Sequence, residues 1–163
     1  MKSNKKSLFD YLRKKNFYRD EKARSLSFFC NDEINSSFIN KELIETMKKI
    51  SKEHKTDLRL NLHSSPKSKH HDMIILQRRN YKCPVHKHLS NGETIHMLYG
   101  SLDVILFNKK KKIMSKISLN KNDKIIYRIP TNLFHTIRIT SSYAIYHENK
   151  KGPFLRKQTV LAF

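Results

Sequence analysis

Turn signals recur about every eight to twelve residues through most of this 163-residue chain and constrain its fold more than any other feature. Between them lie short segments in which apolar and polar residues alternate, as in half-buried strands. We predict strands at 56–64, 72–80, 101–108, 113–119, 124–129, 134–140 and 143–148. Short strands at this spacing are typical of an all-β sandwich or barrel, and a double-sheet jelly roll fits them best.

One domain with an N-terminal extension is the organisation that this length allows, because two domains would each have too small a core. Residues 1–37 are basic and aromatic, and we interpret them as an arm that packs on the domain or on a neighbouring subunit. Nucleic-acid binding is the alternative for this arm. Residues 38–163 form the predicted domain, which begins with a helix at about 41–53 that follows Asn40 as its N-cap.

The formal net charge of +20 first suggests nucleic acid or a membrane surface as a partner. The lysines are scattered, however, and the one long run, 109–112, lies at a predicted hairpin tip, where charges are usually solvated. No nucleic-acid-binding motif is present, so we do not expect that partner. A basic surface still favours an anionic small molecule, including a phosphorylated or nucleotide-linked one.

Several classes are excluded by what the sequence lacks. No apolar run approaches the length of a membrane span or a signal peptide, and three glycines are too few for a dinucleotide-binding fingerprint. Cys30 and Cys83 lie far apart and imply no disulfide framework, which suits a reducing cytoplasm. We expect a soluble cytoplasmic protein in which Cys83 is a buried structural thiol on the strand face opposite His86.

Two histidines and a glutamate after residue 80 have the spacing of a metal site. His86 and His88 lie two apart on a predicted strand, so both imidazoles point to the same face. The sequence Leu-Ser-Asn-Gly then signals a turn, after which Glu93 opens an antiparallel strand that returns towards them. Two imidazoles and one carboxylate are a ligand set that suits a divalent first-row metal.

His135 is the fourth candidate ligand. It begins a strand after a turn at 130–132. In the alternating pattern, His135 and Glu93 each fall on the same strand face as the apolar residues that we expect in the core. Each residue alone has a simpler explanation: His86 and His88 as a surface pair, Glu93 as a solvated strand start, and His135 as a hydrogen-bonded core histidine. Together the four predict a site for one divalent ion, either zinc, iron, manganese or nickel, because buried polar groups need partners.

The strand predicted at 56–64 has one apolar face and one polar face, the latter formed by Arg59, Asn61 and His63. Alternation alone favours a polar face that is exposed to water. The next segment, 64–71, reads as a loop in which His70 and His71 are exposed.

Several stretches together resemble the WbuC-type cupin-fold metalloproteins over residues 38–163. They are Arg59-Leu-Asn-Leu-His63, Asp72, Gln77-Arg78, Val85-His-Lys-His88, Glu93, Gly100, Pro130 to His135, and His147-Glu-Asn-Lys-Lys-Gly-Pro-Phe154. The resemblance implies a cupin jelly roll with a metal held by His86, His88, Glu93 and His135. It also implies that Arg59, Asn61 and His63 line the pocket, that the gene lies among genes for surface polysaccharide and O-antigen sugars, and that a homodimer is common.

The first functional hypothesis is a metal-dependent isomerase or epimerase acting on a sugar or nucleotide-sugar intermediate. Arg59 or Arg128 would hold an anionic group, and His63 or Tyr127 would move a proton. Tyr127 and Arg128 are adjacent on a predicted strand, so at most one enters the pocket. The alternatives are a cupin dioxygenase that uses ferrous iron, and a non-enzymatic metal- or sugar-binding module whose arm contacts nucleic acid.

Overall fold

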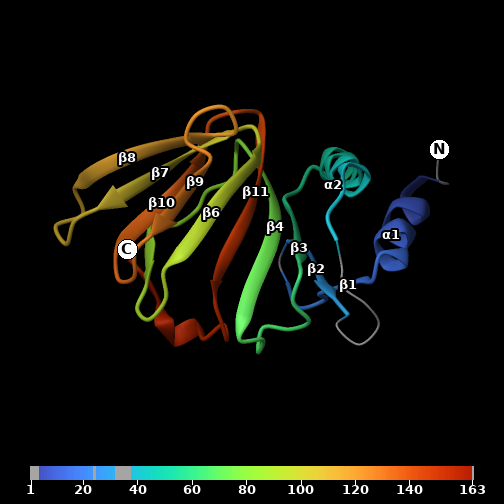
Figure 1. Cartoon of the computed structure of the whole chain (residues 1–163), viewed down its shortest axis with the longest axis horizontal. Coiled ribbons are helices and arrows are strands. Elements are labelled where there is room, and N and C mark those ends of the chain that lie inside the picture. Colours follow the sequence, from blue (N-terminus) through green and yellow to red (C-terminus); the bar gives the residue numbers. More distant parts are fainter. Residues whose placement is uncertain (1–3, 24, 32–37, 163) are drawn as a thin grey trace.

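The computed structural model describes residues 4–23, 25–31 and 38–162, and within them two β-sheets pack face to face with two α-helices beside the larger sheet (Figure 1). The elements in chain order are α1 (Asn4–Lys14), β1 (Phe17–Arg19), β2 (Leu26–Cys30), α2 (Lys41–His54), β3 (Leu58–Asn61), β4 (His70–Arg78), β5 (His86–His88), β6 (Glu93–Tyr99), β7 (Ser101–Phe107), β8 (Ile113–Asn120), β9 (Ile126–Ile129), β10 (Phe134–Ile139), β11 (Tyr143–Lys151), a 3₁₀ turn (Arg156–Gln158) and β12 (Thr159–Leu161).

The larger sheet has the strand order β1-β2-β3-β4-β11-β6-β9, and the smaller one has the order β12-β5-β10-β7-β8. Only β2 and β3 pair in parallel among the described strands; the other pairs are antiparallel. The predicted all-β sandwich is therefore confirmed. No helix within the described residues is long and apolar enough to cross a membrane.

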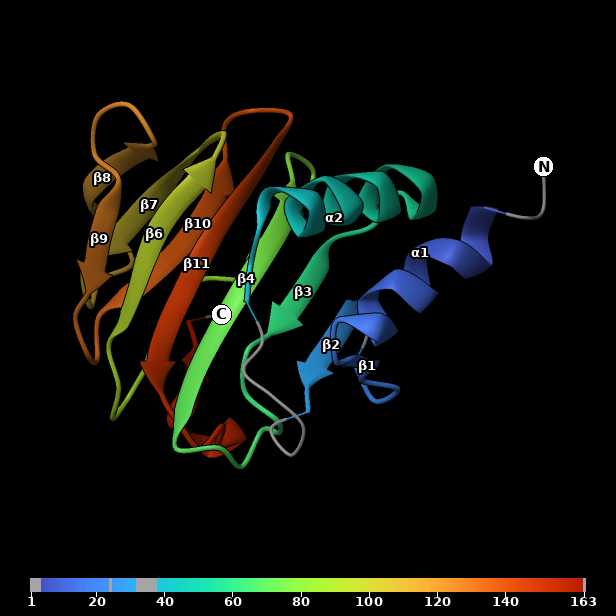
Figure 2. The same ribbon diagram turned by 45° about the vertical axis from the view of Figure 1, so that its right-hand side comes forward.

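Strand β4 is buried on both faces, which explains its continuous apolar run. Met73 and Ile75 pack in the core between the two sheets, whereas Ile74 and Leu76 pack in a second core beneath the helices. Figure 2 shows α2 lying against the outer face of the larger sheet, over β3 and β4. Helices thus cover the outer face of this sheet over β1 to β4, and its inner face lines the interior of the sandwich.

Helix α2 begins and ends with conventional caps. The side chain of Asn40 accepts a hydrogen bond from the backbone N–H of Leu43 at 2.8 Å, and Lys55 ends the helix in the left-handed conformation. Its buried face includes Leu43, Met47 and Ile50, which pack against the outward-facing residues of β3 and β4.

Part of the basic N-terminal segment extends the larger sheet. Strand β2 pairs in parallel with β3, and β1 pairs with β2, while Phe17 and Phe28 are buried in the core beneath the helices. The described part of residues 1–37 therefore packs on the domain; residues 1–3, 24 and 32–37 of this predicted arm lie outside the described residues. The domain boundary between residues 37 and 38 stays a prediction.

Substitution of Met47 tests the packing of α2 on the sheet. Its side chain is fully buried, so Met47→Ala should lower the free energy of unfolding by about 2–5 kcal/mol. Urea unfolding followed by circular dichroism measures this change. Lys49→Ala, at an exposed position of the same helix, is the matched control, and equal stability of the two variants would contradict the described packing.

Candidate metal centre and adjoining cavity

Four side chains from three strands converge at one end of the sandwich. His86 and His88 lie on β5, Glu93 opens β6, and His135 lies on β10 directly opposite His86 in the paired strands. One ligand atom from each of the four lies within 4.8 Å of the others. Glu93 and His135 are only 2% and 1% exposed, so the cluster is closed on the inner side and reached from the side of β5.

The outer nitrogens of the imidazoles are already engaged. Nδ1 of His86 lies 2.9 Å from the carbonyl oxygen of Pro84, and Nδ1 of His135 lies 2.9 Å from that of Leu133. A carbonyl can only accept, so Nδ1–H is the donor in both rings. Nδ1 of His88 lies 3.2 Å from the hydroxyl of Thr159. These bonds orient the rings and leave Nε2 for the centre of the cluster, as metal-ligating histidines require.

The carboxylate of Glu93 lies within hydrogen-bonding distance of two of these rings. Its carboxylate oxygens lie 3.1 Å from Nε2 of His88 and 3.1 Å from Nε2 of His135, and Nζ of Lys150 lies at 3.7 Å. Burial by itself raises the pKa of Glu93, but the hydrogen bonds from the two histidines and the charge of Lys150 outweigh it, so the pKa lies well below its ordinary value. Glu93 is therefore an anion at neutral pH.

The chemistry of this set fits a divalent cation. If Nδ1 of His135 holds the single ring proton, its Nε2 presents a lone pair to the carboxylate of Glu93, and the two acceptors repel each other. Either an additional proton on the ring or a cation between the groups removes this repulsion. Three imidazoles and one carboxylate are ligands for zinc, iron, manganese and nickel alike, so the site could hold one divalent ion of this group.

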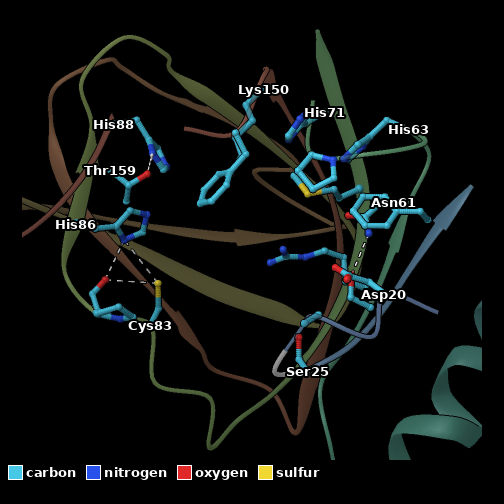
Figure 3. A pocket seen from close by; sticks show the side chains of 18 of the residues that line it. Asp20, Ser25, Asn61, His63, His71, Cys83, His86, His88, Lys150 and Thr159 are labelled. Atoms are coloured by element: carbon cyan, nitrogen blue, oxygen red, sulfur yellow. Dashed lines mark hydrogen bonds between the residues drawn. The ribbon is translucent and has the colours of Figure 1, made fainter. Parts of the chain in front are cut away.

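A cavity of about 450 Å³ adjoins the cluster (Figure 3). His86 and His88 lie on one side of it, and Asn61, His63 and His71 lie across from them. The polar face of β3 thus turns into the cavity, because its apolar face is covered by the helices. Alternation alone predicted a water-exposed face; the structure instead buries Asn61 and His63.

Tyr127 and Arg128, which the sequence offered as a proton carrier and an anion-binding group, are not among the described residues that line the cavity. Tyr127 packs against the core between the sheets, and Arg128 is exposed. Both lie on β9, the edge strand of the larger sheet. Arg59 and His63 therefore remain as the candidates for these two roles.

Among the cavity residues that the sequence analysis missed or misplaced, four come from β4, β11, β12 and the segment before β5. His71, predicted in an exposed loop, is only 4% exposed, because β4 already begins at His70 and pairs with the long strand β11. Lys150 lies opposite His71 in that pair. Thr159, on β12, reaches the cavity because β12 pairs with β5. These positions depend on long-range strand pairing, which local periodicity does not show.

Cys83 is the fourth. It was expected on the face opposite His86, but its sulfur lies 3.9 Å from Nδ1 of His86 and it lines the cavity. The expectation assumed that period-2 alternation holds from residue 83, whereas strand β5 begins only at His86 and the preceding residues are irregular.

Two stacked imidazoles form part of the far wall. The ring centroids of His63 and His71 lie 4.2 Å apart, with an interplanar angle of 12°. Burial, together with the neighbouring His71, lowers the pKa of His63 to about 4. Nδ1 of His63 lies 3.1 Å from the carbonyl oxygen of Asp72 and donates its proton to it. His63 is therefore neutral near pH 7, with its Nε2 left as an acceptor.

Comparison with known proteins gives a partial family match. A family model described as a domain of unknown function, DUF6016, matches residues 39–119, just under half of the chain. A search of the curated proteins found no match.

Solved structures show the fold more clearly. The capsular polysaccharide assembling protein CapF from Staphylococcus aureus is similar with a TM-score of 0.54 and 10% sequence identity, over 65% of this chain and 29% of CapF. Protein SO0799 from Shewanella oneidensis is similar with a TM-score of 0.53 and 8% identity, over 93% of this chain and 82% of that protein. This chain thus spans less than a third of CapF's length.

The fold is a cupin jelly roll. The two-sheet sandwich and its similarity to these structures confirm the fold class predicted from the sequence. At 8–10% identity the likeness concerns the fold alone.

The neutral state of His63 has a measurable consequence for stability. Its folded-state pKa, about 4, lies below the ordinary 6.5, so the unfolded chain binds more protons between these values. The free energy of unfolding of metal-free protein should therefore fall as the pH drops from about 6.5 to about 4, and His63→Asn should reduce this fall. Urea titrations at a series of pH values measure it. His70→Asn, at an exposed neighbouring position, is the control; identical pH profiles for the two variants would contradict the assignment.

Proposed function

We propose that this protein is a WbuC-type, metal-dependent cupin that acts on a sugar or nucleotide-sugar intermediate of surface polysaccharide (O-antigen) biosynthesis, as an isomerase or epimerase. The observation that carries the proposal is the convergence of His86, His88, His135 and the buried carboxylate of Glu93 beside a cavity that also contains Arg59. A bound divalent ion would supply Lewis-acid polarisation of a carbonyl or a pair of ligand oxygens.

The chain's own residues would have separate roles in this reaction. Arg59 would hold an anionic group of the ligand through charge-assisted hydrogen bonds. His63 is neutral with an accepting Nε2, so it would take up a proton from a neighbouring carbon or hydroxyl of the ligand. Lys150, paired with Glu148 at 2.8 Å and close to Glu93, would keep the metal-binding carboxylate ionised and in place.

The biosynthetic setting rests on the sequence resemblance. CapF, whose fold is similar, is itself called a capsular polysaccharide assembling protein, which agrees with that setting. A cytoplasmic location and a homodimer, both expected from the sequence, stay predictions.

The ligand set is tested by elemental analysis of protein purified without chelator. We expect about one divalent ion per chain in the wild type, and loss of most of it in His86→Ala and in His135→Ala, because each removes one of four ligands. His96→Ala is the matched control, since His96 lies on β6 three residues beyond Glu93 and outside the cluster. Full metal content in both ligand variants would refute the site.

The identity of the metal decides between this proposal and a cupin dioxygenase. The same three histidines and glutamate are a ligand set for ferrous iron, which would leave positions for oxygen and substrate. Zinc as the only native metal would exclude redox oxygenation, whereas ferrous iron with ligand-dependent oxygen consumption would favour the dioxygenase. Binding of metal and sugar without any turnover would favour a non-enzymatic binding module.

Ligand binding is tested by titrating a set of nucleotide-linked keto-sugars into metal-loaded protein by calorimetry. We expect at least one to bind, and Arg59→Gln to weaken it about tenfold or more, because a charge-assisted hydrogen bond is lost. Arg128→Gln is the matched control, since Arg128 is exposed and outside the cavity. No binding across the set, or equal effects of the two variants, would contradict the proposal.

A further inference from the structure

The β1–β2 hairpin forms a wall of the cavity. Asp20, Ala23, Ser25, Ser27 and Phe29 all belong to this N-terminal segment and line the cavity. Asp20 and Ser25 lie across the cavity from Cys83 and His86 in Figure 3. The hairpin is outside the stretch that the family model matches, which begins at residue 39. The cavity of this chain is therefore completed by residues that the shared region does not supply.

Three cavity residues lie in one row across neighbouring strands. Ser27 on β2 is the parallel partner of Arg59 on β3, and the carbonyl of Ser27 accepts a 2.8 Å hydrogen bond from the backbone N–H of Asp20 on the other side. Neighbouring strands lie about 4.8 Å apart, so the backbones of Asp20 and Arg59 are roughly 10 Å apart with Ser27 between them. All three line the same cavity, so the row presents a carboxylate, a hydroxyl and a guanidinium in order.

The row is held firmly in place. The side chain of Asn61 donates to the hydroxyl of Ser27 at 3.0 Å and to the carbonyl of Phe28 at 2.8 Å, which fixes β2 against β3. The guanidinium of Arg19 donates to the carbonyl oxygens of Ser25 at 2.8 Å and Ser27 at 3.2 Å, which ties the two sides of the hairpin.

The charged groups at the two ends of the row are not paired with each other. Within the described residues, the guanidinium of Arg59 makes no ion pair or hydrogen bond, and the carboxylate of Asp20 accepts only from the backbone N–H of Lys22 at 3.1 Å. Arg19, the cation on the neighbouring residue, is directed to backbone carbonyls instead. A partly buried guanidinium and carboxylate that face a cavity without partners are available to a ligand.

We propose that the row Asp20–Ser27–Arg59 is a recognition site for a hydroxylated anion, such as a sugar acid or sugar phosphate. Arg59 binds the carboxylate or phosphate, and Asp20 accepts hydrogen bonds from hydroxyl groups about one sugar ring away. This inference deepens the proposed function and rests on it for the chemistry at the metal, but the row contains none of the proposed metal ligands. It assigns the N-terminal hairpin to ligand selection.

The size and lining of the cavity agree with such a ligand. A volume of about 450 Å³ is within the range of small-molecule sites and holds a monosaccharide with its anionic group. Phe29 lies beside the row and contacts His63 edge to face, with ring centroids 5.6 Å apart. It adds an apolar surface next to the polar groups, as sites for amphipathic ligands require.

The experiment separates charge from hydroxyl recognition. Calorimetry would measure the binding of D-glucuronate and D-glucose 6-phosphate. D-glucose is the uncharged reference probe, and inorganic phosphate is the reference anion that has no sugar hydroxyl groups. We expect glucuronate or glucose 6-phosphate to bind more tightly than either reference probe. Asp20→Asn should weaken that binding about tenfold, because hydrogen bonds to a charged acceptor are lost, without weakening phosphate. Binding of glucuronate alone would identify a carboxylate as the anionic group that the site recognises, and binding of glucose 6-phosphate alone would identify a phosphate.

Asp123→Asn is the matched control, since Asp123 is an exposed carboxylate paired with Lys124 in a distant turn. The inference is overturned if neither hydroxylated anion binds more tightly than phosphate, or if Asp20→Asn behaves like Asp123→Asn. Each titration is run on metal-loaded and on chelator-treated protein. If the protein takes up no metal but Asp20→Asn still weakens ligand binding, the proposed function is refuted and this inference stands. The two outcomes can be told apart because Asp20→Asn is measured with and without metal.

Discussion

The buried carboxylate of Glu93 is the constraint on which the site depends. A carboxylate that is 2% exposed is costly unless it is compensated, and here the compensation comes from His88, His135 and Lys150. Backbone carbonyls and a hydroxyl hold the outer nitrogens of the three imidazoles, so the inner nitrogens face the centre of the cluster, and those of His88 and His135 lie 3.1 Å from Glu93. Such a group of acceptors is stable around protons or a metal ion, and the ligand types favour the metal.

The cavity lies beside this cluster because the two faces of the larger sheet have different roles. Helices cover the part of the outer face that β1 to β4 form, where Leu58 and Leu60 of β3 and Ile74 of β4 are buried. The polar residues of β3 are therefore turned inward, towards the cavity beside the His/Glu cluster, together with residues of the N-terminal hairpin. One sheet thus combines a structural face with a ligand-binding face.

Local patterns in the sequence were sufficient to predict that four potential metal ligands lie close together. The two-residue spacing of His86 and His88, the turn before Glu93 and the phase of His135 each concern a few neighbouring residues, and the structure brings these four side chains together. The all-β fold followed from the same alternation and turns. The helix predicted at about 41–53 lies at Lys41–His54, because Asn40 is a strong N-cap signal.

The cavity could not be predicted in the same way. Whether Asn61 and His63 face water or a cavity depends on which sheet face the helices cover, and alternation does not contain that information. His71 reaches the cavity through the pairing of β4 with β11, and Asp20, which follows β1, through the pairing of β1 with β2 and of β2 with β3. Cys83 was misplaced because a strand period was extended into an irregular segment. Apart from Cys83, contacts between residues distant in sequence decided these cases.

Anomalous X-ray scattering from crystals of the metal-loaded protein, recorded at the absorption edge of the bound metal, tests the central claim most directly. The account predicts one peak within about 2.0–2.2 Å of nitrogens from His86, His88 and His135 and of a carboxylate oxygen of Glu93. A metal peak elsewhere in the molecule, or no peak among these four side chains in fully loaded protein, would contradict it.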